Sequence, residues 1–262
     1  MLSKQKLKDI RSLQVKKYRR ETGLFLAEGE KIVEELMRSD IAIEMIVATP
    51  GWLSLHPQAE KACRELLETD AGELEKISTL STPNQVVAVG KTPHSATEMN
   101  GFGKQLVLAL DNLQDPGNLG TIIRIADWFG IGRLVCSEET VEAFNPKVVQ
   151  ASMGSIFRIG IDYVPLNQWI RRYSDHFGYP VYGTFTGGEN IYTQDLALYG
   201  LIIMGNESKG ISETVREQVN HKLTIPRFEG SGAESLNVSM ATAIVCSEFR
   251  RRNPAGFIQN GN

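Results

Sequence analysis

The chain lacks long apolar runs and has few cysteines, and both features exclude classes of protein. No stretch of about 18 consecutive apolar residues occurs, so we expect no transmembrane helix. The charged N-terminus is not followed by an apolar segment, so we expect no secretory signal and a cytoplasmic location. The three cysteines, Cys63, Cys136 and Cys246, are scattered without the spacing of metal ligands. They therefore indicate reduced thiols rather than a disulfide framework or a metal site.

Several catalytic signatures are missing as well. The sequence contains no Gly-x-Ser-x-Gly motif, no histidine pair at metal-binding spacing and no Gly-x-Gly-x-x-Gly fingerprint after a strand. These absences disfavour serine hydrolases and zinc hydrolases. An unrelated nucleotide-binding enzyme of the doubly wound type becomes the weakest alternative, and we expect no metal cofactor.

The net charge of −3 conceals a strongly basic N-terminus. The first 20 residues hold eight basic side chains and one acid, Asp9, which leaves a net charge of −10 on the rest of the chain. Such asymmetry predicts contact with a polyanion at this end, and a solvated, charged helix face is the alternative. The eight basic residues are Lys4, Lys6, Lys8, Arg11, Lys16, Lys17, Arg19 and Arg20.

The 262 residues fall into two segments that differ in their sequence pattern and are joined by a linker. Residues 91–104 are rich in Thr, Pro, Ser, Asn and Gly, which is typical of a linker. We predict a first domain over residues 1–97, a linker over 98–104 and a second domain over 105–262. In the first domain, apolar spacing predicts helices at 3–20, 29–38 and 57–67 and strands at 24–27, 43–48 and 85–89.

The second domain repeats the pattern of a strand, a glycine loop and a helix. Leu106–Leu110 is apolar throughout, as expected of a strand that is buried on both faces. The repetition predicts an α/β fold with a mostly parallel sheet and helices on both faces, which binds ligands at the carboxyl ends of its strands. We predict strands at 106–110, 134–136, 180–184, 201–204 and 222–225, and helices at 120–129, 146–153, 166–173, 212–219 and 236–251.

Three separated stretches combine an apolar run with a loop of small and polar residues. A folded domain does not need an Asn in each of three such loops, so we infer that the loops bind one ligand. Their glycines allow a ligand to approach the main chain closely. The stretches are Asp115–Arg124, Met204–Gly210, and Ile225–Pro226 followed by Ser235–Ser239.

Purely structural interpretations of the same residues remain open. Asn118 can cap the helix that follows it, and Ser235 can cap the last helix of the chain. Arg124 lies one turn into a helix, where it can form a surface ion pair with Asp127 or Asp111.

Taken together, the three stretches resemble the motifs of the SpoU (TrmH-type) branch of the SPOUT RNA methyltransferases. Order, spacing and adjoining strands agree over about residues 105–252, and residues 151–158 also resemble a family segment. The first 90 residues resemble the substrate-binding domain, related to ribosomal protein L30e, that often precedes the catalytic part. Two loops depart from the pattern. Ser208-Lys209 stands where many relatives have a Gly, and residues 226–234 form a longer loop.

The resemblance implies a fold, a reaction and a cofactor. It implies a parallel-sheet domain with a deep trefoil knot, a homodimer formed through that knotted domain, and no requirement for a metal. The implied reaction transfers a methyl group from S-adenosyl-L-methionine to a ribose 2′-hydroxyl of structured RNA, with rRNA favoured over tRNA. The implied cofactor-binding residues are Thr184, Gly205, Ile225, Pro226, Leu236 and Asn237.

The resemblance also assigns a catalytic role to Arg124, which would activate or orient the ribose hydroxyl. A guanidinium stays protonated in proteins, so orienting the hydroxyl and stabilising developing negative charge is the simpler role. Asn118, Glu207, Ser235 and Asn237 would position the ribose and Arg124. A non-catalytic RNA-binding or ribosome-assembly factor that retains the same fold is the alternative.

Overall fold

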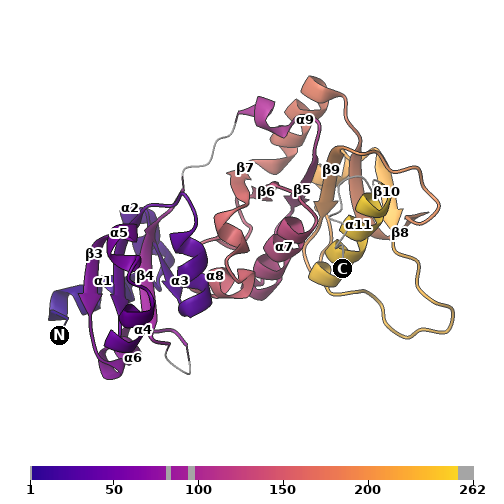
Figure 1. Cartoon of the computed structure of the whole chain (residues 1–262). Helices are drawn as coiled ribbons and strands as arrows, with labels where there is room; N and C mark the ends of the chain where they lie inside the picture. Colours follow the sequence, from indigo (N-terminus) through magenta and orange to yellow (C-terminus); the bar gives the residue numbers. More distant parts are fainter. Residues whose placement is uncertain (1, 81–83, 94–97, 253–262) are drawn as a thin grey trace, which may run out of the picture. The chain divides into compact units, whose positions relative to one another are not determined.

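The computed structural model describes residues 2–80, 84–93 and 98–252, and Figure 1 shows their helices and strands. The chain divides into two compact units. Unit 1 comprises Met1–His94 together with Glu142–Arg158, and unit 2 comprises Ser95–Val141 and Ile159–Asn262. The predicted domain boundary at residue 97 lies outside the described residues. Within the described ranges, no helix combines the length and apolar character that a membrane span requires.

Unit 1 is built on a four-stranded sheet with the strand order β1-β4-β2-β3. β4 pairs antiparallel with both β1 and β2, whereas β2 and β3 are parallel. The strands are β1 (Leu24–Glu28), β2 (Ile43–Ala48), β3 (Cys63–Glu68) and β4 (Val86–Lys91). The helices are α1 (Lys4–Ser12), α2 (Lys16–Thr22), α3 (Glu30–Met37), α4 (Pro50–Leu55), α5 (Ala59–Ala62), α6 (Ala71–Ile77) and α8 (Pro146–Ser152), with a 3₁₀ turn η2 (Ser155–Phe157).

Two helix predictions in this unit were wrong. The helix predicted at 57–67 ends at Ala62, because the next residues pair with β2 in register from Ile43–Cys63 onward. Pairing with a neighbouring strand here overrides local helix propensity. The helix predicted at 3–20 is interrupted after Ser12, and α2 begins at Lys16.

The basic N-terminal segment is anchored in the core of unit 1. Leu2, Ile10 and Leu13 are all less than 10% exposed and belong to a cluster with Leu26 and Val47 of the sheet. α1 also contacts α6. The segment is therefore an amphipathic structural element whose apolar side the fold requires.

Residues Glu142–Arg158 complete unit 1 beside β1, although their position in the sequence suggested the second domain. The ring of Phe25, which is fully buried, lies 4.6 Å from that of Phe144 and 6.0 Å from that of Phe157. Arg19 donates two hydrogen bonds to the Glu142 carboxylate, at 3.1 and 2.7 Å. A bidentate pair of this kind is a strong, charge-assisted contact.

Unit 2 contains a six-stranded sheet in which every pair of neighbours is parallel, with the order β10-β8-β9-β5-β6-β7. This confirms the predicted mixed α/β fold with a parallel sheet; the edge strand β7 was not predicted. The strands are β5 (Leu106–Leu110), β6 (Arg133–Ser137), β7 (Gly160–Val164), β8 (Val181–Asn190), β9 (Gly200–Met204) and β10 (His221–Thr224). The helical elements are η1 (Met99–Phe102), α7 (Pro116–Trp128), α9 (Leu166–Phe177), α10 (Glu213–Arg216) and α11 (Val238–Arg251).

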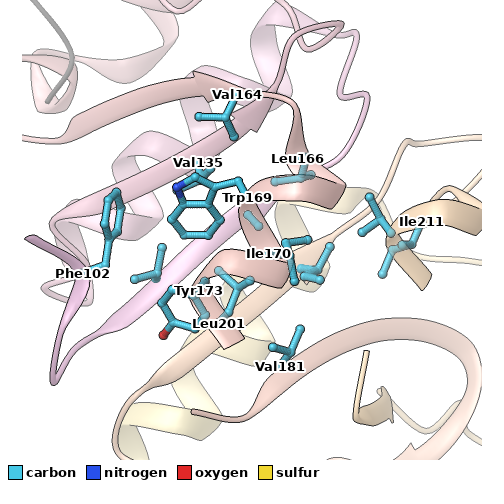
Figure 2. Packing of buried hydrophobic residues seen from close by; sticks show 14 residues of the cluster. Phe102, Val135, Val164, Leu166, Trp169, Ile170, Tyr173, Val181, Leu201 and Ile211 are labelled. Atoms are coloured by element: carbon cyan, nitrogen blue, oxygen red, sulfur yellow. The ribbon is translucent and has the colours of Figure 1, made fainter. Parts of the chain in front are cut away.

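Helices cover both faces of this sheet, as predicted. Figure 2 shows α9 packing Trp169, Ile170 and Tyr173 against Val181 and other buried strand residues. Tyr182, the next residue of β8, instead contacts Phe249 of α11, with ring centroids 4.9 Å apart. Because successive side chains of a strand point to opposite faces, α11 lies on the face opposite α9. α7 packs against α11.

The three cysteines are free thiols, as the sequence predicted. Cys136 and Cys246 are fully buried, and burial raises the pKa of the Cys246 thiol to about 12. Cys63 is only partly buried, and burial raises the pKa of its thiol as well. Thiols that remain protonated at neutral pH are poor nucleophiles, so the structure gives them no catalytic role.

We expect Glu142→Gln to destabilise unit 1, because the guanidinium of Arg19 is only 3% exposed and would lose its ionic partner. Breaking a buried ion pair from one side costs about 3 kcal/mol. Lys17→Met is the matched control, since Lys17 and Glu21 form an exposed pair at 3.9 Å, and the expected change is under about 1 kcal/mol. Urea unfolding followed by circular dichroism measures both variants. Equal effects of the two substitutions would contradict the expectation.

Candidate functional site

The second sequence motif forms a closed turn directly after β9. Asn206 and Gly210 exchange two backbone hydrogen bonds of 3.0 Å, and the Asn206 side chain accepts from the backbone N–H groups of Ser208 and Lys209. Gly205 is required at the start of the turn, since a Cβ there would lie 2.3 Å from the carbonyl carbon of Gly210. The turn therefore presents its backbone at the carboxyl edge of the sheet, where ligands of parallel sheets bind.

Glu207 connects this turn to the first motif. Its Oε1 accepts hydrogen bonds from the backbone N–H of Asp115 and from Nδ2 of Asn118, both at 3.2 Å. Its Oε2 accepts from the backbone N–H of Gln114 at 3.4 Å. An ionised carboxylate only accepts hydrogen bonds, so all three donors must point toward it.

Asn118 extends the connection to the third motif. Nδ2 of Asn237 donates to Oδ1 of Asn118 at 3.0 Å. Oδ1 of Asn237 in turn accepts from the backbone N–H of Ser239 and caps α11. We call this set, Glu207, Asn118 and Asn237, the amide network. It brings together three catalytic positions that the sequence predicted.

The structure also decides two alternatives that the sequence left open. Asp115, not Asn118, is the N-cap of α7, because its Oδ1 accepts from the backbone N–H of Asn118 at 2.7 Å. Asn237 caps α11, and Ser235 lies exposed before that helix. The side chain of Asn118 is therefore free of the capping role and serves the amide network.

Arg124 is exposed on α7, and its side chain forms no hydrogen bond or ion pair among the described residues. The ion pairs with Asp127 or Asp111, which the sequence left open as an alternative, are not formed within the described ranges. Asp111 is buried and its Oδ2 accepts from the backbone N–H of Ser212 at 2.7 Å. The guanidinium of Arg124 therefore has all of its donors available. Among the described residues, no direct contact joins it to the amide network.

A cavity of about 960 Å³ lies at the carboxyl edge of the sheet of unit 2. Of the six predicted cofactor-binding residues, Thr184, Gly205, Ile225, Pro226 and Leu236 line it, whereas Asn237 does not. Glu207 and Ser235 also line the cavity; Asn118 and Arg124 lie outside its wall. The second and third motifs thus line one cavity, and the first motif joins them through Asn118 without lining it.

Several lining residues were missed by the sequence analysis. Phe185 and Arg216 belong to no motif, and only the position of α10 beside β8 brings them to the cavity. Phe228, which is 88% exposed, lies in the longer loop between the parts of the third motif. The one indication in the sequence that Phe228 could line the cavity is that its loop is longer than in many relatives. Among residues 2–80, 84–93 and 98–252, no cluster of His, Cys, Asp and Glu suits a metal ion.

The basic residues predicted to bind RNA fall into two groups in unit 1. Lys4, Lys8, Arg11, Lys16, Lys17 and Arg20 are exposed. Lys6 forms an ion pair with Glu65, and Arg19 is buried against Glu142. Two uncharged side chains are exposed beside the cations of α2. Tyr18 of the helix is 44% exposed, and Val15, just before it, is 51% exposed.

We expect Glu207→Ala to release the loop that precedes α7. The backbone N–H groups of Gln114 and Asp115 would lose their acceptor, and a net loss of about 1 kcal/mol per hydrogen bond corresponds to about fivefold faster amide exchange. Hydrogen exchange resolved to single residues measures this. The amides of Ser208 and Lys209, which Asn206 holds, serve as the internal control. Unchanged exchange at Gln114 and Asp115 would show that Glu207 does not order the loop.

Solved structures and curated proteins resemble this chain over nearly its whole length. A protein from Porphyromonas gingivalis assigned to the TrmH family has a TM-score of 0.85 and 37% identity, covering 96% of this chain and 99% of its own. An AdoMet-bound rRNA methyltransferase from Sinorhizobium meliloti has a TM-score of 0.84 and 31% identity, covering 96% of both chains. The 23S rRNA (guanosine(2553)-2'-O)-methyltransferase RlmP of Bacillus subtilis (strain 168) is 34% identical over 94% of this chain and 96% of its own.

Family matches cover both parts of the chain. Residues 4–88 match the MRM3-like substrate binding domain, which agrees with a substrate-binding domain at the N-terminus. Residues 105–247 match the SpoU rRNA Methylase family, and this range contains the cavity and the amide network. With more than half of its length matched and its three motifs joined by the amide network, the chain belongs to the SpoU rRNA Methylase family.

Proposed function

We propose that this protein transfers a methyl group from S-adenosyl-L-methionine to a ribose 2′-hydroxyl of RNA, with rRNA as the substrate. The amide network is the observation that carries the proposal, because it joins all three family motifs beside one cavity. Membership of the SpoU family and the names of the relatives from Bacillus subtilis and Sinorhizobium meliloti support the same reaction.

The cavity suits S-adenosylmethionine in size and chemistry. Its volume of about 960 Å³ lies at the upper end of small-molecule sites. Ile225, Leu236 and Val238 supply apolar surface for a purine ring and a thioether-like chain, while the turn after Gly205 supplies backbone groups for polar atoms. When bound, the cofactor supplies a methyl group that is already activated on a sulfonium centre, so the transfer needs no metal.

Arg124 is the candidate catalytic residue. Since a guanidinium can only donate hydrogen bonds, Arg124 orients the ribose hydroxyl and stabilises negative charge as the oxygen loses its proton. Because Arg124 has no partner among the described residues, no existing ion pair must break before it meets the substrate. Asn118, Glu207, Ser235 and Asn237 position the ribose and the loop that leads into α7.

Unit 1 contributes RNA affinity through its exposed cations. Arg19 is left out of this set because its guanidinium is committed to Glu142 and to the carbonyl oxygen of Leu13. The exposed ring of Tyr18 among Lys16, Lys17 and Arg20 adds a stacking surface of the kind that RNA-binding proteins use.

The assembly and location follow from the family resemblance alone. We propose a cytoplasmic homodimer formed through unit 2, whose C-terminal segment forms a trefoil knot. The non-catalytic alternative, an RNA-binding or ribosome-assembly factor, makes a different prediction. If calorimetry detects RNA binding but no affinity for S-adenosylmethionine, the protein is a non-catalytic RNA-binding factor and the proposed enzymatic function is wrong.

We expect Arg124→Ala to reduce methylation of rRNA at least about a hundredfold, because the donor that stabilises the transition state is lost. Affinity for S-adenosylmethionine should not change, since Arg124 lies outside the cavity wall. Incorporation of labelled methyl groups into rRNA from a deletion strain measures the first quantity, and calorimetry measures the second. Arg171→Ala, an exposed arginine on α9, is the matched control. Methylation by Arg124→Ala at the rate of that control would remove Arg124 from the mechanism.

We expect the substitution of Lys16, Lys17 and Arg20 by Gln to weaken RNA binding and to reduce its dependence on salt. Each lost phosphate contact lowers the slope of log affinity against log salt by about one. Deleting the N-terminal segment would be a poor test, because Leu2 and Ile10 are buried in the core of unit 1.

Lys31, Lys61 and Lys76 supply the control for that experiment. They are exposed lysines of unit 1 on other helices, and replacing them by Gln removes the same charge. Filter binding over a salt series compares the two triple variants. Equal slopes would show that α2 has no special part in RNA binding.

A further inference from the structure

Arg216 is a cation of the cavity wall that is held in position without an ionic partner. Its guanidinium lies over the ring of Phe185, with Cζ 5.2 Å from the ring centroid, and both side chains line the cavity. Within the described part of the chain, Arg216 forms no ion pair and its side chain donates no hydrogen bond. A guanidinium stacked on an aromatic face keeps the N–H groups at its edge free for a ligand.

The platform under this guanidinium is fixed by the core of unit 2. The ring of Phe185 lies over Gly183, where an added Cβ would come within 2.8 Å of both the ring and Val219. Phe185 and Val219 pack against the cluster that contains α9. The β8 strand therefore needs a glycine at this position to accommodate the ring.

The helix that carries Arg216 is also fixed at both sides. The buried carboxylate of Asp111 accepts from the backbone N–H of Ser212, directly before α10, at 2.7 Å. Val215, the neighbour of Arg216, is 2% exposed in the same core cluster. Because the backbone that carries Arg216 is already ordered, binding of a ligand loses little free energy to the ordering of this segment.

Other charged residues of the cavity wall are less suited to hold an anion. The Glu207 carboxylate is committed to three donors, and Arg227 donates to the carbonyl oxygen of Ala233 within its own loop. Lys209 is exposed on the turn after β9 and offers a single flexible ammonium. Arg216 is therefore the residue of the cavity wall whose guanidinium is positioned to donate two hydrogen bonds to a carboxylate or phosphate.

We propose that Arg216, stacked on Phe185, binds an anionic group of a ligand in this cavity. The inference rests on the proposed function, which offers two sources of such a group. One is the carboxylate of the methionine part of S-adenosylmethionine, and the other is a phosphate of the substrate RNA. Both accept two parallel hydrogen bonds from a guanidinium.

The experiment compares wild type and Arg216→Met in two binding assays. Calorimetry without RNA measures S-adenosylmethionine and 5′-methylthioadenosine, which lacks the carboxylate. If the cofactor carboxylate is the partner, affinity for S-adenosylmethionine falls about tenfold and affinity for methylthioadenosine does not change. If RNA phosphate is the partner, cofactor affinity is unchanged, RNA affinity falls, and the salt slope decreases by about one.

Further variants separate binding from folding. Phe185→Leu keeps an apolar side chain over Gly183 but removes the aromatic face, so the same ligand should bind about threefold more weakly. Arg216→Lys should recover part of the affinity that Arg216→Met loses. Arg171→Met, an exposed arginine of α9, removes an equal charge elsewhere in unit 2 and should bind both ligands like wild type. Thermal unfolding of each variant reports on folding.

The outcomes also separate this inference from the proposed function. Wild-type binding of both ligands together with unchanged binding by Arg216→Met overturns the role of Arg216 and leaves the methyltransferase proposal standing. A wild-type protein that binds neither S-adenosylmethionine nor rRNA overturns both.

Discussion

The site depends on one carboxylate. Glu207 accepts hydrogen bonds from two backbone N–H groups and from the amide of Asn118, and because it can only accept, it fixes the direction of every amide beyond it. Asn118 must turn its oxygen toward Asn237, which then turns its own oxygen toward the start of α11. A chain of polar groups with one allowed direction holds three loops in one arrangement. The cavity wall and the entry to α7 both follow from it.

The availability of the guanidinium or ammonium group, more than its charge, distinguishes the cations that we propose to act on ligands from the structural ones. Arg19 and Arg124 are both arginines in helices, yet Arg19 is buried in a bidentate pair and Arg124 is exposed without a partner among the described residues. Arg216 is a third case, since its guanidinium lies over an aromatic ring and its side chain forms no ion pair or hydrogen bond within the described part of the chain. A count of basic residues in the N-terminal segment would treat Lys6 and Arg19 as RNA contacts, although both are engaged by carboxylates.

Local patterns predicted those elements whose structure depends mainly on their own residues. The apolar run Leu106–Leu110 became a fully buried central strand, and its neighbours gave the predicted parallel sheet. The prediction failed where pairing with distant residues decides, as in β3, which follows a single turn of helix and pairs with β2. For Asn118 the sequence left two interpretations open, because an Asn beside a helix start looks like a cap whether or not Asp115 already performs that role.

The sequence by itself determined the family, the parallel α/β architecture and the residues of the three motifs, because glycine loops after buried strands and unusual polar residues are local features. Only the tertiary structure decided what those residues do. It connected Asn118 to Asn237 across 119 positions, left the Arg124 side chain without a partner among the described residues, and committed Arg19 to Glu142. It also brought Phe185 and Arg216 together at the cavity, although neither residue belongs to one of the three motifs. Hydrogen bonds and stacking between distant residues require the folded backbone, so spacing along the chain cannot reveal them.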